Sequence, residues 1–254
     1  MQVTKRSRRP EPRVTQAPDA ARPRGAVDGP LLRLGAALGV VGVVLQVVMD
    51  RLHPHHVDPN QSAAVFREYA HSENWTAVHL GQFIGTLLIV VALVALARAL
   101  SRQPGVAGAL AVVGGVTAVI VGAVFAVQMA VDGVALKAAI DSWMGAVSPG
   151  DRSSSFHVAE SVRWTEKGLS GFFQIVNGVT LFSLGLSIAV SRSFPKWLGG
   201  VGIAAGVGFV AGGVSTAHTG FSAAAGTFLM PATLLLAFFL LGVFTSMWRR
   251  ASTR

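Results

Sequence analysis

Residues 75–97 read WTAVHLGQFIGTLLIVVALVALA, a stretch of 23 residues without a single Asp, Glu, Lys or Arg. A transmembrane α-helix needs about 20 mainly apolar residues to cross about 30 Å of hydrocarbon. Inside lipid, only helices and closed barrels satisfy every backbone hydrogen bond, and the stretch lacks the alternation of period two that is typical of a barrel strand. The segment therefore predicts a transmembrane helix.

Five other segments have the same length and apolar character, so the fold class predicted is an all-α, polytopic transmembrane helix bundle. Only 13% of the 254 residues are charged, against about 25% in soluble domains. The chain has no cysteine, which excludes disulfides, thiolate metal sites and cysteine nucleophiles. The six predicted transmembrane helices, within a domain at 30–248, are 31–49, 75–97, 105–130, 171–190, 196–217 and 226–247.

The distribution of charge predicts an N-in/C-in orientation. With the N-terminus in the cytoplasm, 15 of the 21 Lys and Arg residues fall on the cytoplasmic side, and nine of the 12 acidic residues fall outside. Residues 1–29 are predicted to be a disordered basic cytoplasmic tail, and residues 249–254 a short cytoplasmic tail. We expect the lipid bilayer as partner, with anionic lipid headgroups near the N-terminal tail, and no nucleic acid.

Two long connections, 50–74 and 131–170, lie on the outer side in this orientation. They contain segments that read as short extracytoplasmic helical extensions, at 61–71, 132–143 and 156–167, with a turn predicted at 148–155. The inner connections are only a few residues long. The sequence therefore places most of the material for specific recognition outside.

Polar side chains gather at the outer ends of five predicted helices. Each helix carries a pair spaced three or four residues apart, which puts both members on one helical face. The pairs are Gln46/Asp50, His79/Gln82, Gln128/Asp132, Gln174/Asn177 and Ser215/His218. Converging faces would line an outward-facing polar pocket, and the alternative is ordinary interfacial packing. The residues predicted to line such a pocket are His79, Gln82, Asp132, Glu166, Gln174 and His218.

Histidines suggest two further sites, neither of which the sequence favours. One segment offers metal-ligand donors for zinc or another divalent ion from His53, His55, His56 and Asp58. Its proline and close spacing make joint ligation awkward, so the sequence favours a solvated surface loop. His79 and His218 would be axial haem ligands only if their two helices faced each other. No cofactor is therefore assigned.

No motif identifies a reaction. The chain contains no G-x-S-x-G, H-E-x-x-H or phosphate-binding loop, so it carries only weak signs of an enzyme. The six helices show no evident repeat, and their middles read as apolar, which argues against a permeation path. The sequence predicts a membrane protein of unknown activity that binds a small ligand or ion at its outer face. Its alternatives are a membrane-embedded enzyme or haem/metal protein with an extracytoplasmic site, and a small transporter.

Four phrases of the sequence form a recognisable set. They are WTAVHLGQFIG at 75–85, VDGVALK at 131–137, RWTEKG at 163–168 and FPKWLG at 194–199. Together they resemble uncharacterised bacterial integral membrane proteins grouped under a domain of unknown function. The resemblance covers about residues 31–247 and implies a multi-pass, six-helix protein of a bacterial plasma membrane. It implies no activity, cofactor or oligomeric state.

Overall fold

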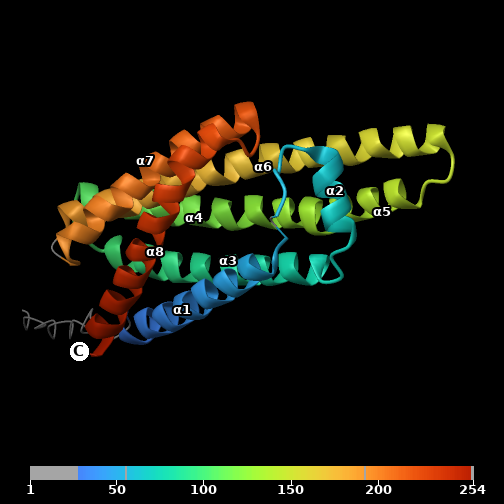
Figure 1. Ribbon diagram of the computed structural model, residues 1–254. Helices are drawn as coiled ribbons and strands as arrows, with labels where there is room; N and C mark the ends of the chain where they lie inside the picture. The colour runs from blue at the N-terminus through green and yellow to red at the C-terminus, as the bar shows by residue number, and fades with distance from the viewer. Residues whose placement is uncertain (1–27, 55, 192, 253–254) are drawn as a thin grey trace, which may run out of the picture.

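The computed structural model describes residues 28–54, 56–191 and 193–252, and these are almost entirely helical (Figure 1). The predicted basic tail lies outside the described residues over 1–27. Six helical stretches are long and apolar enough to cross a membrane, which confirms the predicted six-helix architecture. The elements are α1 (Asp28–Leu52), α2 (Ser62–Ala70), α3 (Trp75–Leu100), α4 (Val106–Ala130), the π-helix η1 (Val131–Leu136), α5 (Lys137–Gly145), α6 (Pro149–Val190), α7 (Lys196–Thr219) and α8 (Ala223–Ser252).

The six long helices pack as a closed series of neighbours. In order of contact the series runs α1, α3, α4, α6, α7 and α8, and α8 returns to α1. Figure 1 shows α8 crossing the bundle obliquely to reach α1. The guanidinium of Arg33 on α1 donates to the carbonyl oxygen of Ala251 on α8 over 3.0 Å. The start of α1 and the end of α8 therefore lie at the same end of the bundle, here called the inner end.

Helices α6 and α7 approach closely because glycines face each other along their seam. A Cβ on Gly178 would meet the carbonyl oxygen of Gly206, and one on Gly185 would meet that of Gly199. Gly171 faces Gly213 in the same way. Each set repeats every seven residues, which keeps it on one helical face. Small residues at this spacing let transmembrane backbones pack through van der Waals contact.

The inner half of the bundle is filled by an apolar core. Its fully buried side chains include Leu96, Leu184, Leu198, Phe239 and Phe244. These residues come from four of the long helices, α3, α6, α7 and α8, so this core holds most of the bundle together. At the opposite end, here called the outer end, a separate apolar cluster forms under α2 and α5.

The outer end is covered by a small helical cap. The ring of Phe66 on α2 lies 6.0 Å from that of Trp143 on α5 and 5.7 Å from that of Phe156 on α6. The prediction of a turn over 148–155 is wrong for most of that segment, because α6 begins at Pro149 and continues unbroken to Val190. Proline is favoured in the first turn of a helix, and the Ser148 hydroxyl caps it by accepting from the Asp151 amide.

Candidate functional site

A π-helical turn sets the position of Asp132. The segment α4 passes directly into η1, where hydrogen bonds run from residue i to i+5, and such turns are frequent at functional sites. Two neighbouring side chains of α3 bind the carbonyl groups of this turn. Trp75 Nε1 donates to the Asp132 carbonyl oxygen over 2.9 Å, and Thr76 Oγ1 donates to that of Gly133, also over 2.9 Å. The outer turn of α3 therefore fixes η1 in place.

One turn further along α3, His79 pairs with the Asp132 carboxylate. Its Nε2 lies 3.0 Å from Asp132 Oδ2, and both residues are buried, with exposed fractions of 2% and 6%. Its Nδ1 lies 2.7 Å from the Trp75 carbonyl oxygen, which can only accept, so Nδ1 carries a proton. A Cβ on Gly133 would overlap the His79 side chain, so glycine is needed there for the pair to form.

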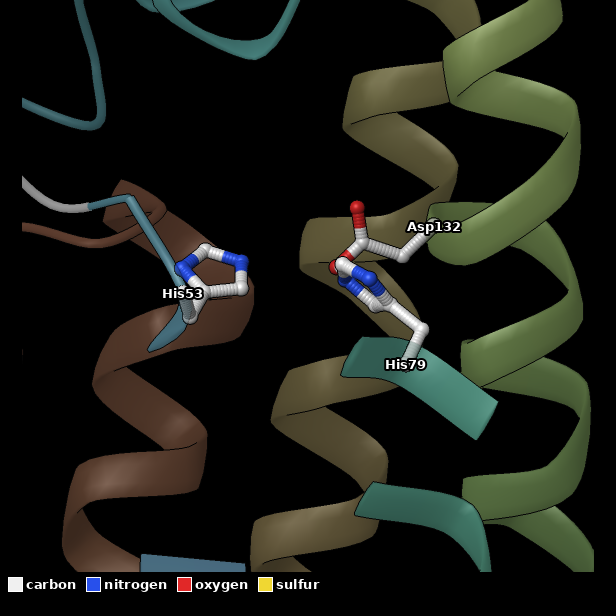
Figure 2. A group of neighbouring side chains, drawn as sticks. All are labelled: His53, His79 and Asp132. Atoms are coloured by element: carbon white, nitrogen blue, oxygen red, sulfur yellow. The ribbon is translucent and has the colours of Figure 1, made fainter. Parts of the chain in front are cut away.

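His53, in the connection that follows α1, completes a cluster with this pair. Its ring lies 5.0 Å from the ring of Trp75 and 5.3 Å from that of His79. His53, His79 and Asp132 each offer a ligand atom, and the three atoms lie within 4.8 Å of one another. Figure 2 shows the His53 ring facing the other two side chains across the site.

The surroundings of His53 favour its neutral form. Burial lowers the pKa of the His53 imidazole below its ordinary value, and the neighbouring His79 lowers it further, while Asp132 acts in the opposite direction. A neutral imidazole keeps a lone pair, which a metal ion requires of a histidine ligand. At the same time, Asp132 Oδ1 is buried and has no hydrogen-bond partner among the described residues.

A buried ion pair on α6 fastens the cap over this cluster. Arg163 Nη1 donates to Glu166 Oε2 over 2.7 Å, and Nη2 donates to the Tyr69 hydroxyl of α2 over 3.3 Å and to the Pro59 carbonyl over 3.4 Å. Burial raises the pKa of Tyr69 to about 12, although the Arg163 charge opposes this. Through these hydrogen bonds Arg163 holds Tyr69 of α2 and Pro59 of the preceding connection against α6.

Below the cluster, polar side chains of α6 continue toward the inner end. Gln174 Nε2 donates to Ser170 Oγ over 3.2 Å, and Gln174 Oε1 is buried without a hydrogen-bond partner among the described residues. The expectation of apolar helix middles is wrong for α6 at Thr180, which donates to Thr117 Oγ1. Nearer the inner end, Ser187 donates to the Ala107 carbonyl. Short hydroxyl side chains are accommodated there because each bonds to the neighbouring helix.

The structure brings together only some residues of the predicted pocket. His79 and Asp132 are in contact, Glu166 and Gln174 are buried on α6, and Gln82 is half-buried on α3. His218 is exposed on α7 and is not part of the cluster. The structure gives the haem alternative no support, because His79 Nε2 faces Asp132 instead.

The predicted metal loop also contributes one residue. His53 joins the buried pair, whereas His56 and Asp58 are exposed and His55 lies outside the described residues. The sequence predicts His53 in one set and His79 and Asp132 in another. Only the path of the chain after α1 brings the two sets together, and no spacing in the sequence encodes that path.

Two imidazoles and one carboxylate form a familiar ligand set for a metal ion. Zn²⁺ takes His and Asp ligands at about 2.0–2.2 Å and keeps an open position in sites with three protein ligands. Two histidines and one carboxylate also bind Fe²⁺. Ligand atoms at such bond lengths lie about 3.3 Å apart in a tetrahedral site, close to the 3.0 Å between His79 Nε2 and Asp132 Oδ2.

Comparison with known families gives one match. The family described as "Domain of unknown function (DUF4386)" matches residues 27–245, which is most of the chain. Among curated proteins and solved structures, nothing matches. The match confirms the resemblance to a family of unknown function. It names no activity, so a function has to be inferred from the residues of the site.

Proposed function

The chain belongs to the DUF4386 family, whose description names no activity, and from its own site we propose that it binds a divalent first-row transition-metal ion. The ion lies at the outer end of the helix bundle, under the cap formed by α2. His53, His79 and Asp132 are its protein ligands. In the predicted N-in/C-in orientation, this end faces away from the cytoplasm.

One observation carries the proposal. Three side chains with the chemistry of metal ligands come from three separate segments, and their ligand atoms lie within 4.8 Å of one another. The segments are the connection after α1, the first turns of α3, and η1. Exposed acidic and histidine side chains often cluster by chance on a surface, but His79 and Asp132 are buried.

The hydrogen bond of His79 to the backbone supports the same function. Metal-binding histidines almost always donate their other ring N–H to a carbonyl or carboxylate, which fixes the tautomer and directs the remaining nitrogen to the ion. His79 Nδ1 meets the Trp75 carbonyl in this way, and Nε2 faces Asp132. The unpartnered Asp132 Oδ1 gives the carboxylate a second oxygen for the ion or for a water bound to it.

The test is elemental analysis of detergent-purified protein that carries a tag without histidine. After incubation with Zn²⁺ or Fe²⁺ and removal of the excess, we expect near-stoichiometric metal in the wild type. His79→Ala and Asp132→Asn each remove a ligand and should lose the ion, whereas the matched control His218→Ala keeps it. A cooperative thermal unfolding transition without metal shows that each variant is folded. Equal metal contents in the wild type and in folded Asp132→Asn would contradict the proposal.

A further inference from the structure

A hollow on the surface of the outer end lies directly beside the buried cluster. It has a volume of about 310 Å³ and is formed by the end of α1, the connection after it, and the last turn of α2. The side chains that matter for its chemistry are His53, His56, Glu68, His71 and Arg51. The hollow therefore brings three histidines and a carboxylate together, and one of the histidines is His53.

His53 is part of both the hollow and the buried cluster with His79 and Asp132. It lines the hollow, and its ring also packs against those of Trp75 and His79. Because His79 and Asp132 are nearly inaccessible to solvent, an ion needs a path through the side chains that cover them. The half-buried His53 is in contact with both the hollow and the pair.

Glu68 gives the hollow an oxygen suited to a cation. Its Oε1 accepts a hydrogen bond from the His56 backbone N–H over 2.9 Å, which orients the carboxylate. Its Oε2 is buried and lacks a hydrogen-bond partner among the described residues. A buried carboxylate oxygen without a donor is costly, and a bound cation would compensate for the lost hydration.

His71 is oriented by the same kind of hydrogen bond to the backbone as His79. Its Nδ1 lies 2.6 Å from the Arg67 carbonyl, as that of His79 lies 2.7 Å from the Trp75 carbonyl, and in both cases the carbonyl is four residues earlier. Nδ1 therefore donates in each ring, which leaves Nε2 as the nitrogen that can bind an ion; in His79 this nitrogen faces Asp132 Oδ2 over 3.0 Å. This is the arrangement that prepares a histidine for metal ligation.

We infer that this hollow is a loading site for a hydrated divalent first-row transition-metal ion, which it captures with Glu68 and His71 and passes to the buried cluster through His53. The inference rests on the proposed function, since it supplies the entry path for that ion. Arg51 also lines the hollow and is exposed. Its positive charge weakens capture, which suits a site that releases the ion inward.

The test is the rate of Co²⁺ uptake by full-length protein that has been stripped of metal in detergent. Co²⁺ takes the same nitrogen and oxygen ligands, and its visible absorption reports ligation. Charged groups in a cleft can change association rates by 10-fold or more, so we expect Glu68→Gln and His71→Ala each to slow uptake about tenfold. The final amount of bound Co²⁺ stays at the wild-type value, and Arg51→Gln accelerates uptake.

Two matched controls separate the hollow from general surface effects. Glu73→Gln makes the same change of charge five residues from Glu68, at an exposed position that does not line the hollow. His157→Ala removes an exposed histidine of α6. Both should load at the wild-type rate.

The outcomes distinguish the two proposals. Wild-type rates in Glu68→Gln and His71→Ala, with full final binding, would overturn the loading site and leave the buried site intact. Reduced final binding at an unchanged rate would also overturn it, because these residues would then belong to the final site. Absence of Co²⁺ uptake by the wild type would refute the buried site and the loading site together.

Discussion

The inner and outer halves of this bundle use the same helices to bury different kinds of side chain, apolar in the inner half and charged or polar in the outer half. Near the inner end, Leu96, Leu184 and Phe239 are completely buried in a core of apolar side chains. Near the outer end, the same helices α3 and α6 bury His79, Arg163 and Glu166. Burying charge costs free energy unless every group is paired, whereas apolar packing and close helix contact stabilise without this requirement. The inner half therefore serves as the scaffold that allows the outer half to hold charged groups.

The largest effect is expected from breaking the scaffold at the glycine seam of α6 and α7. A side chain on Gly199 would meet backbone atoms of Ala189 and Gly185 at 2.7–2.8 Å, whereas nothing lies within 4 Å of a Cβ on the adjacent Gly200. We expect Gly199→Leu to lower the free energy of unfolding by more than the about 1–3 kcal/mol that overpacking usually costs, because the backbone atoms it meets cannot move aside. Gly200→Leu should leave the melting temperature in detergent almost unchanged. Equal melting temperatures would show that the seam is not close-packed.

The next effect concerns the ion pair that fastens the cap. Arg163→Met leaves Glu166 buried without its 2.7 Å partner, which typically costs about 3–5 kcal/mol. The double variant Arg163→Met/Glu166→Leu removes both charges and should recover most of that loss. Thermal unfolding of the two variants measures the difference. A double variant no more stable than the single one would indicate that Arg163 acts mainly through Tyr69 and Pro59.

A smaller effect is expected at the hydrogen bond that positions the π turn. Trp75→Phe keeps the ring but removes the N–H that binds the Asp132 carbonyl. Groups that orient metal ligands typically contribute 10–100-fold in affinity, so we expect metal affinity to fall by about tenfold. Trp248→Phe at the inner end is the control, since Trp248 is exposed. Titration with Co²⁺ compares the metal affinities of the two variants. Equal affinities would show that the Trp75 hydrogen bond does not position the metal ligands.

The smallest effect is expected for the hydroxyl pair that joins α4 and α6. Thr180→Val removes the 2.9 Å hydrogen bond to Thr117 Oγ1. Hydrogen bonds between transmembrane helices contribute about 0.6 kcal/mol on average. Thr245→Val removes a hydroxyl that bonds only within α8 and serves as the control. A change above about 2 kcal/mol at Thr180 would indicate that this pair does more than hold two helices together.

The halves also differ in how far the sequence predicts them. The six helices follow from apolar length alone, because a lipid environment leaves an apolar segment of 20 residues few other conformations. The spacing of His79 and of Asp132 at the outer ends of their helices placed both in the predicted pocket, and the structure brings them into contact. Helical periodicity carries that information.

Two features of the site have no such signal, and the start of a helix near it has a local signal that the predicted turn does not include. Chain reversal after α1 brings His53 to the pair, and no periodicity describes an irregular connection. The π turn at η1 shifts the helical register around Asp132, but Val131–Leu136 reads as ordinary helix. The unbroken α6 replaces a predicted turn because Ser148 caps and Pro149 starts a helix in a segment rich in serine. Tertiary contacts decide the position of His53 and of the π turn, so the sequence alone does not predict them. The start of α6 is decided by a local cap.

The most direct test of this difference between a metal-binding outer half and a supporting inner half is hydrogen exchange of the detergent-purified protein, with and without Zn²⁺. We expect slower exchange on metal binding in the 53–61 connection, in α2 and in η1, with no change in residues 92–100 of α3 at the inner end. That result would show that the metal binds at the outer end and that metal binding does not change the stability of the inner core. Exchange unaffected by Zn²⁺ in every segment, or slowed equally at both ends, would contradict the account.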